Sequence, residues 1–243
     1  SQVNRLARWQ ALEYITSQNF DRRAAAVLNA ISVVPGCVGA WRAETVRSVG
    51  GYQTDTLAED ADLTWRVRRA GWRIVTDNDA LAYTEAPEKL TDLLKQRFRW
   101  TFGTLQVLVK HRRACFDPKL GAFGLLFVPL LWVFQFLLPA LAPAADIGLL
   151  MAALTGHLAA ASLYFAFFFL LELSAGLLAL YLDGADSRTT WRLIRELPLQ
   201  RIVYRYLLFA VLLRSLQAAL LGIRASWGKL ERKGTARIKV LGN

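Results

Sequence analysis

Three long apolar runs in the second half of the chain constrain its fold more than any other feature. The run 120–142 has no charged side chain, the run 158–182 has one, Glu172, and the run 202–223 has two arginines. A helix of about twenty apolar residues crosses the hydrocarbon layer of a bilayer. Each run is therefore predicted to form a transmembrane helix.

Pro139 and Pro143 are predicted to break the first run near its end. The shorter apolar segment 147–155 that follows could complete a fourth crossing or re-enter the same face. The tail 224–243 is strongly basic, which predicts a cytosolic end, because cytoplasmic segments carry an excess of Lys and Arg. If the soluble first part is cytosolic too, the number of crossings is even. We therefore expect four helices within 119–223, in an integral plasma (inner) membrane protein.

The charge of the chain fits this arrangement. Its 243 residues carry a net charge of +11, although 54% of them are hydrophobic. Both numbers follow if apolar residues gather in the spans and Lys and Arg flank them. Nucleic-acid binding is the rival explanation, but the basic residues lie beside the apolar runs and no nucleic-acid motif appears, so no nucleic-acid partner is predicted. Two cysteines, Cys37 and Cys115, are too few for a disulfide framework or a metal site.

The first 95 residues have the pattern of an α/β domain. Helices are expected at 3–30 and 42–49. Short apolar or alternating segments bounded by turn residues predict strands. These strands lie at 31–34, 37–41 and 72–76. Gly36 and Gly39, beside the first strand, allow close approach of the backbone to another group. A tight turn and the wall of a binding pocket explain these glycines equally well.

Three carboxylates, Glu59, Asp60 and Asp62, stand where the next helix begins. Apolar residues at i, i+4 and i+7 predict this helix over 61–70, ended by Gly71. Carboxylates favour a helix N-terminus because they cap its free N–H groups and complement its dipole. Their position alone therefore does not indicate catalysis.

A basic amphipathic helix is predicted over 88–111, and it contains the sequence Gln96-Arg97-Phe98-Arg99-Trp100. Such a helix can lie in the membrane interface or pack against the soluble domain. The apolar run that begins at Leu120 favours the interface. We assign 96–118 to this interfacial segment.

Together the acidic segment and this helix resemble two hallmarks of the processive, membrane-integrated family 2 glycosyltransferases. In that family a Glu-Asp element precedes a Gln-x-x-Arg-Trp that lies just before the membrane helices. Here they read Ala58-Glu59-Asp60 and Gln96 to Trp100, with Gly36 upstream and apolar runs downstream. Either motif alone is a weak signal, and the two in this order are a strong one. The resemblance covers nearly the whole chain, and residues 84–88 bring it closest to poly-β-1,6-N-acetylglucosamine synthases.

The resemblance implies the C-terminal half of a GT-A-type domain, followed by an α-helical transmembrane bundle. It implies that Asp60 is the general base that takes the acceptor hydroxyl proton, with Glu59 and Asp62 supporting the site. It also implies that Gly36 and Cys37 line the acceptor pocket.

The Gln-x-x-Arg-Trp side chains receive binding roles by the same resemblance. Arg99 would stabilise the departing diphosphate, Trp100 would stack on a sugar ring, and Gln96 would bind either group. The alternative for Arg99 and Trp100 is membrane-interface anchoring, which is common for both residue types.

The resemblance further implies an earlier half that binds the nucleotide and holds Mg²⁺ or Mn²⁺ at an Asp-x-Asp site. Asp77-Asn78-Asp79 has the letters of such a site, but it follows the Glu-Asp element instead of preceding it. A turn built from Asp and Asn explains it better. No metal ligand is therefore predicted within the chain, which we expect to be a fragment that is inactive alone.

The expected parent protein is an inverting glycosyltransferase that polymerises N-acetylglucosamine or a related sugar from a UDP-sugar. Its expected partners are this donor, the growing polysaccharide, the lipid bilayer and accessory envelope subunits. A cellulose- or hyaluronan-like synthase is the alternative. A non-catalytic transporter or channel subunit is the alternative class, but it gives no reason for Asp60 and Gln96 to Trp100 at this spacing.

Two charges lie inside the predicted spans at similar depth. Glu172 is near the middle of 158–182, and Arg214 is near the middle of 202–223. Ionised groups at that depth are costly and face protein or water. We expect Glu172 and Arg214 to pair and thereby hold two helices together.

Overall fold

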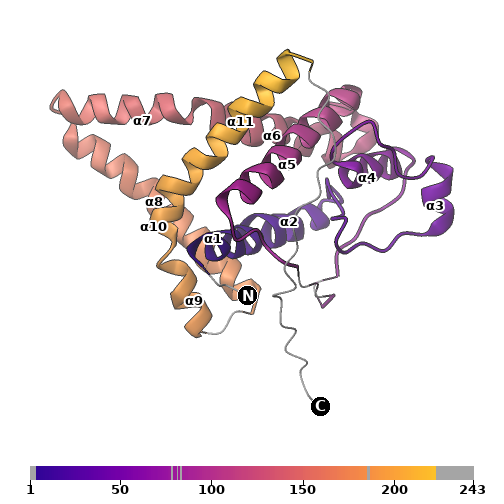
Figure 1. Cartoon of the computed structure of the whole chain (residues 1–243), viewed down its shortest axis with the longest axis horizontal. Helices are drawn as coiled ribbons and strands as arrows, with labels where there is room; N and C mark the ends of the chain where they lie inside the picture. Colours follow the sequence, from indigo (N-terminus) through magenta and orange to yellow (C-terminus); the bar gives the residue numbers. More distant parts are fainter. Residues whose placement is uncertain (1–3, 78, 81, 83, 185–186, 223–243) are drawn as a thin grey trace.

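The computed structural model describes residues 4–222 except 78, 81, 83, 185 and 186 (Figure 1). The predicted basic tail 224–243 lies outside the described residues. Six helices form the first half of the chain. They are α1 (Arg5–Glu13), a π-helical turn (Tyr14–Phe20), α2 (Asp21–Val27), α3 (Ala43–Ser48), α4 (Glu59–Arg69) and α5 (Leu90–Lys110). The helices predicted for this half are confirmed.

The helix α4 begins and ends for the reasons expected from its sequence. Its first turn contains Glu59, Asp60 and Asp62, and its last turn contains three arginines, so both ends complement the helix dipole. Gly71 follows with φ of +88°, the left-handed conformation that ends helices.

The predicted strands do not form in the described residues, where segments 31–34, 37–41 and 72–76 are extended or turning loops without a ladder. Ile31 and Ile74 are nevertheless buried, and they pack with Leu63 and Val67 of α4. The apolar pattern of these segments therefore indicates that they are buried against α4. It does not indicate strand pairing, because a strand also needs a neighbour for its backbone hydrogen bonds. The α/β prediction is not confirmed by the described residues.

Three helices are long and apolar enough to cross a membrane: Phe123–Leu154, Leu158–Leu182 and Ile202–Leu220. This is the pattern of a membrane protein. The described residues thus provide three candidate spans where four were expected. The segment 147–155 continues the first helix and does not form a span of its own. These three helices therefore do not give the even number of crossings that was expected.

Prolines explain why the first span does not break where the sequence suggested. Two π-helical turns, Phe123–Phe127 and Val133–Leu137, each end two residues before a proline, Pro129 or Pro139. Proline cannot donate a helical hydrogen bond, and a wider turn accommodates the carbonyl groups that it leaves. The helix therefore passes through α6 (Val128–Trp132) and α7 (Leu138–Leu154) without stopping.

The remaining helices follow the first span. They are α8 (Leu158–Leu182), α9 (Ser187–Ile194), α10 (Leu197–Leu199), a π-helical turn (Gln200–Tyr204) and α11 (Arg205–Leu220), with short 3-10 turns at Arg112–Ala114 and Pro118–Leu120 before the span. Figure 1 shows α7 and α8 projecting to one side as a helical hairpin, and α11 running beside α5. No residue of α7 is buried, as expected for a lipid-facing helix.

One core cluster connects the soluble part to the candidate spans. Trp65 of α4 packs with Leu105 and Leu108 of α5, and this group continues to Phe123 of the first span and Leu212 of α11. The ring of Phe123 meets that of Trp65 edge-on, with centroids 5.0 Å apart. The soluble helices and the membrane helices therefore share one core.

The expected pair between Glu172 and Arg214 is wrong for the described structure. The guanidinium of Arg214 lies over the ring of Phe98, 5.3 Å from its centroid, and no ion pair joins it to a described acid. The reason is that α11 packs against α5 at this depth. Among the described residues, Arg205 does pair with another span: its Nη2 lies 2.5 Å from Asp146 Oδ2 on α7.

Candidate active site

Asp60 lies in the first turn of α4 and is held by the loop that contains Gly36. The Gly36 N–H donates to Asp60 Oδ2 at 3.0 Å. The Thr64 hydroxyl donates to the Asp60 carbonyl at 2.7 Å and accepts from the Val34 N–H at 3.0 Å. Asp60 itself is only half-buried. The loop thus fixes the carboxylate while part of it remains accessible.

The loop at Gly36 forms the tight turn that its glycines predicted, and its role as the wall of a binding pocket stays a prediction. The Val38 N–H donates to the Pro35 carbonyl at 3.1 Å, which closes a tight turn around Gly36 and Cys37. The same turn faces Asp60 through the Gly36 amide. Cys37 is an exposed free thiol. The turn therefore forms one wall beside the carboxylate.

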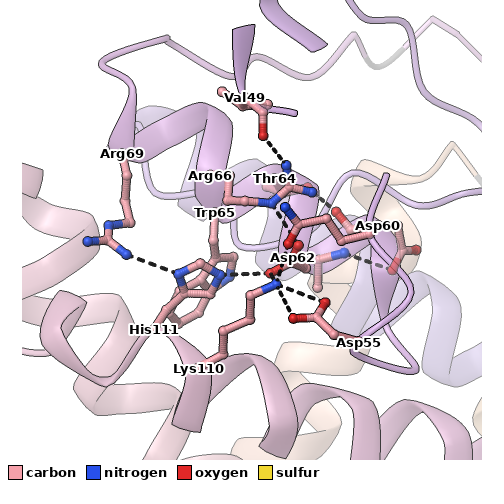
Figure 2. A network of polar contacts seen from close by, with 12 residues as sticks. Val49, Asp55, Asp60, Asp62, Thr64, Trp65, Arg66, Arg69, Lys110 and His111 are labelled. Carbon is pink, nitrogen blue, oxygen red and sulfur yellow. Dashed lines mark hydrogen bonds and ion pairs between the residues drawn. The ribbon is translucent and has the colours of Figure 1, made fainter. Parts of the chain in front are cut away.

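Asp62 differs from Asp60 because it is completely buried, with 0% of its surface exposed. Three nitrogen groups contact it, as Figure 2 shows: Arg66 Nε at 2.7 Å, Lys110 Nζ at 2.8 Å and His111 Nε2 at 2.8 Å. Burial alone would raise the pKa of Asp62, but hydrogen bonds from His111, Lys110 and Arg66 outweigh burial and hold that pKa well below its usual range. Asp62 is a charged link between α4 and the end of α5.

His111 is held by α4 through both ring nitrogens. Arg69 Nη1 lies 3.2 Å from His111 Nδ1. Because a guanidinium can only donate, Nδ1 must accept, and the ring proton then belongs to Nε2, which donates to Asp62 Oδ1. The arrangement assigns His111 to the neutral tautomer that bears its proton on Nε2.

Lys110 extends the same network to the loop that precedes α4. Besides Asp62, its Nζ contacts Asp55 Oδ2 at 2.8 Å and Gln53 Oε1 at 2.8 Å. Arg66 completes the connection from the other side by donating to the carbonyls of Val49 and Gly51. The loop 49–55 is thus attached to both helices.

The middle of α5 touches the residues just before the acidic turn. Gln106 Oε1 accepts from the Leu57 N–H at 2.9 Å. A Cβ placed on Gly103 would stand 2.7 Å from the backbone nitrogen of Ala58, a distance that real Cβ atoms do not show. Gln96, Gly103 and Gln106 occupy one stripe of α5 at spacings of seven and three residues. The segment just before Glu59 is therefore packed directly against α5, beyond the Gln96 to Trp100 motif.

The first half of α5 packs against α1 and the last span. Arg97 is 3% exposed, and its Nη2 lies 2.7 Å from Glu13 Oε2, which also accepts from the Tyr204 hydroxyl at 2.6 Å. The guanidinium lies over the ring of Trp100, 4.3 Å from its centroid. One face of Trp100 is thus covered by Arg97, and Trp100 as a whole is partly exposed.

Tyr14 lies beside the Gln-x-x-Arg-Trp helix. Its ring centroid lies 6.3 Å from that of Trp100. Burial raises the pKa of Tyr14, and the positive charge of Arg97 opposes that rise.

The remaining predicted site residues are less constrained. Gln96 is 9% exposed, and its Oε1 forms no hydrogen bond within the described part of the chain. Glu59 and Arg99 are partly exposed.

Comparison with known proteins identifies the family. A sequence profile described as "Glycosyl transferase family group 2" matches residues 1–181, more than half of the chain. The chain belongs to this family. The predicted resemblance to family 2 glycosyltransferases is confirmed.

Similar curated proteins bear the name poly-beta-1,6-N-acetyl-D-glucosamine synthase. The one from Staphylococcus aureus (strain COL) is 28% identical over 137 residues, which cover 55% of this chain and 33% of that protein. The one from Staphylococcus epidermidis is 26% identical over 133 residues, covering 53% and 32%. The match thus spans about a third of the length of these relatives. No solved structure matches this glycosyl transferase chain.

The described residues of this glycosyl transferase chain do not fit a metal ion. They contain no group of three or more His, Cys, Asp or Glu side chains suited to one. Asp62 is surrounded by positive or donating groups, and Asp79 folds back so that its N–H donates to Asp77 Oδ1 at 3.0 Å, as in the predicted turn. We therefore derive no chemical step through a metal in this part of the protein.

Sequence reasoning missed several residues that build the site. They are Glu13, Tyr14, Arg66, Arg97, Lys110 and His111. Only the pair of Asp62 and Arg66 carries a local signal, because the two residues are four apart on one helix face. The others meet across distances of more than forty residues, for which periodicity gives no indication.

Proposed function

We propose that this chain is part of a membrane glycosyltransferase that polymerises N-acetylglucosamine from a UDP-sugar. It would pass the polysaccharide across the membrane through the helices that follow residue 122. Support comes from the family match, the names of the curated relatives, and the three candidate spans. The soluble part would then be cytosolic, because nucleotide sugars are cytosolic. A cytosolic tail, as predicted from its basic residues, would require an even number of crossings in the full-length protein.

The different environments of Asp60 and Asp62 are the observation that carries the proposed chemistry. A general base must reach its substrate and must be free to accept a proton. Asp62 is excluded by complete burial and by its three donors. Asp60 is half-buried, and backbone amides hold it in place. Asp60 is therefore assigned as the base, and Asp62 as the group that fixes α4 beneath it.

The proposed reaction inverts the configuration at the anomeric carbon of the donor sugar. Asp60 takes the proton of the acceptor hydroxyl while the hydroxyl oxygen forms a bond to the anomeric carbon. The bond from that carbon to the diphosphate oxygen breaks, and UDP leaves with the electron pair. Arg99 would stabilise the charge that develops on the diphosphate. Trp100 would stack on the acceptor sugar, with Gln96 and the turn at Gly36 and Cys37 beside it.

Two alternative functions are considered for the same candidate site. A cellulose- or hyaluronan-like synthase would use the same base and differ in the donor. A non-catalytic transporter subunit would need the spans but not a positioned Asp60 beside the Gln-x-x-Arg-Trp helix. Divalent metal and accessory envelope subunits belong to the proposal for the full-length protein.

The test is Asp60→Asn in the full-length protein in membranes, assayed by incorporation of radiolabelled UDP-N-acetylglucosamine. Loss of a general base lowers the rate by about 100-fold or more, whereas UDP binding should remain. The matched control is Asp55→Asn, because Asp55 is exposed and contacts only Lys110 among described groups. Near-normal polymer formation by Asp60→Asn would refute the assignment. Parallel assays with UDP-glucose and UDP-glucuronate identify the donor.

A further inference from the structure

The connection between the last two spans carries a basic surface that the proposed reaction does not use. The helix α9 follows α8 and precedes α11, so it lies at the membrane end that both spans share. Figure 1 places α9 beside α1 and away from α3 and α4. Its inner side chain Leu193 is 0% exposed and packs with Leu12 of α1 and Leu180 of α8.

The outer side of α9 has a different character. Trp191 is 64% exposed, and Arg192 and Arg195 are exposed as well. Neither arginine side chain forms an ion pair or hydrogen bond with another group in the described part of the protein. A helix with a packed apolar side and an exposed Trp and Arg side is typical of the membrane interface.

These arginines border a hollow of about 760 Å³, lined by Arg8, Trp191, Arg192, Arg195 and Glu196. The single acid, Glu196, is 8% exposed and already engaged: Arg8 Nη2 lies 2.7 Å from Oε1, Arg5 Nε lies 3.5 Å from Oε2, and the Trp9 ring N–H donates to Oε2 at 3.1 Å. Arg5 and Arg8 thus neutralise this carboxylate, and Arg192 and Arg195 line the same hollow. The hollow has a net positive charge with two arginines uncommitted.

We propose that this hollow binds the phosphate headgroup of an anionic phospholipid. Each Lys or Arg near an anionic leaflet contributes about 1 kcal/mol of attraction, and a guanidinium can hold a phosphate with two parallel hydrogen bonds. Trp191 would lie at the headgroup level, beside acyl chains that cover α8 and α11. The site is separate from Asp60 and does not depend on the proposed reaction.

Thermal unfolding of the full-length protein in neutral detergent tests this site. The added probe is phosphatidylglycerol, phosphatidylcholine with the same acyl chains, or inorganic phosphate. Phosphatidylglycerol should raise Tm by several degrees more than phosphatidylcholine does. Arg192→Gln with Arg195→Gln should lose at least half of this difference, whereas Arg192→Lys with Arg195→Lys should keep most of it. The difference is taken within each variant, so an altered starting stability does not obscure it.

The control is Arg47→Gln with Arg73→Gln, which removes the same charge from exposed positions in the soluble part, outside the candidate spans. This control should retain the full lipid effect. The proposal is overturned if the Arg192 and Arg195 glutamine variant responds like the wild type, or if the control loses as much. An equal rise with inorganic phosphate would also overturn it, because the site would then take a free anion and not a lipid.

Discussion

Gly103 of α5 and Ala58, just before α4, lie in backbone contact. A Cβ on residue 103 would stand 2.7 Å from the Ala58 nitrogen and 2.8 Å from the Ala58 Cβ. This contact brings the Glu-Asp element against α5, the helix that contains Gln-x-x-Arg-Trp. Their pairing in the sequence thus corresponds to a physical junction between two helices.

Gly103→Ala should destabilise the protein, although alanine favours helices by up to about 1 kcal/mol over glycine. The new methyl group meets backbone atoms that cannot rotate away, and such overpacking costs about 1–3 kcal/mol. Thermal unfolding in detergent should show a lower Tm. Gly148→Ala on α7, where nothing lies within 4 Å of the added Cβ, is the control and should leave Tm unchanged or raise it. Equal behaviour of the two variants would contradict the tight junction.

Asp62→Asn should destabilise the junction strongly. The change leaves Arg66, Lys110 and His111 facing a neutral amide in a buried position. Breaking a buried charged network in this way costs about 3–5 kcal/mol. Thermal unfolding measures it, and Asp55→Asn, which removes an exposed contact of the same Lys110, should cost less than about 1 kcal/mol.

Asp62 should also make stability depend on pH in a defined direction. Its pKa is lowered in the folded protein, whereas in the unfolded chain it is near about 3.9. The unfolded state therefore binds the proton first as pH falls, so the stabilisation is present above about pH 4 and is lost below it. The wild type should lose more stability than Asp62→Asn between about pH 5 and pH 3. Parallel curves for the two proteins would show that Asp62 is not the responsible group.

Glu13 and Arg97 should behave as a coupled pair. Arg97→Met removes the buried cation from the Trp100 face and leaves the Glu13 carboxylate with only the Tyr204 hydroxyl. Glu13→Gln leaves the buried Arg97 guanidinium without its carboxylate partner. A double-mutant cycle on unfolding should give a coupling energy of about 1–3 kcal/mol. Simple addition of the two costs would show that the pair contributes nothing of its own.

The charges in the candidate spans should divide into one coupled and one independent pair. Asp146→Asn and Arg205→Gln should be non-additive, because these side chains lie 2.5 Å apart. Glu172→Gln and Arg214→Gln should add to within about 0.5 kcal/mol, because Arg214 lies over Phe98 instead. Coupling between Glu172 and Arg214 in the same assay would show that the helices rearrange in the membrane.

The sequence predicted local features of this protein well. The approximate bounds of α4 and α5 follow from apolar spacing and, for α4, from the charges at its ends and Gly71 after it, which depend on near neighbours only. The extended segments around Ile31 and Ile74 show the limit, because alternation indicates burial but does not supply a strand partner. The span 123–154 shows another, since Pro139 suggested a break that a π-helical turn avoids.

The candidate site was predictable in part for the same reason. Motif spacing indicated Asp60 and Gln96 to Trp100, and the turn at Gly36 was placed beside them by resemblance. The donors around Asp62 come from α4 itself and from the far end of α5. Only the folded chain brings Lys110 and His111 to that carboxylate. Composition and the spacing of apolar residues therefore could not distinguish the role of Asp62 from that of Asp60.

The length of α5 has a mechanical consequence. One uninterrupted helix of 21 residues, about 31 Å long, is attached to the last span near Arg97 and to α4 from Gly103 to His111. A packed helix moves as a stiff rod, so its two attachments cannot shift separately. A tilt of the last span would therefore move α4 and the carboxylate of Asp60, and a shift of Asp60 would move the span. In the proposed function, movement of the product within the membrane would therefore reach the candidate active site through α5.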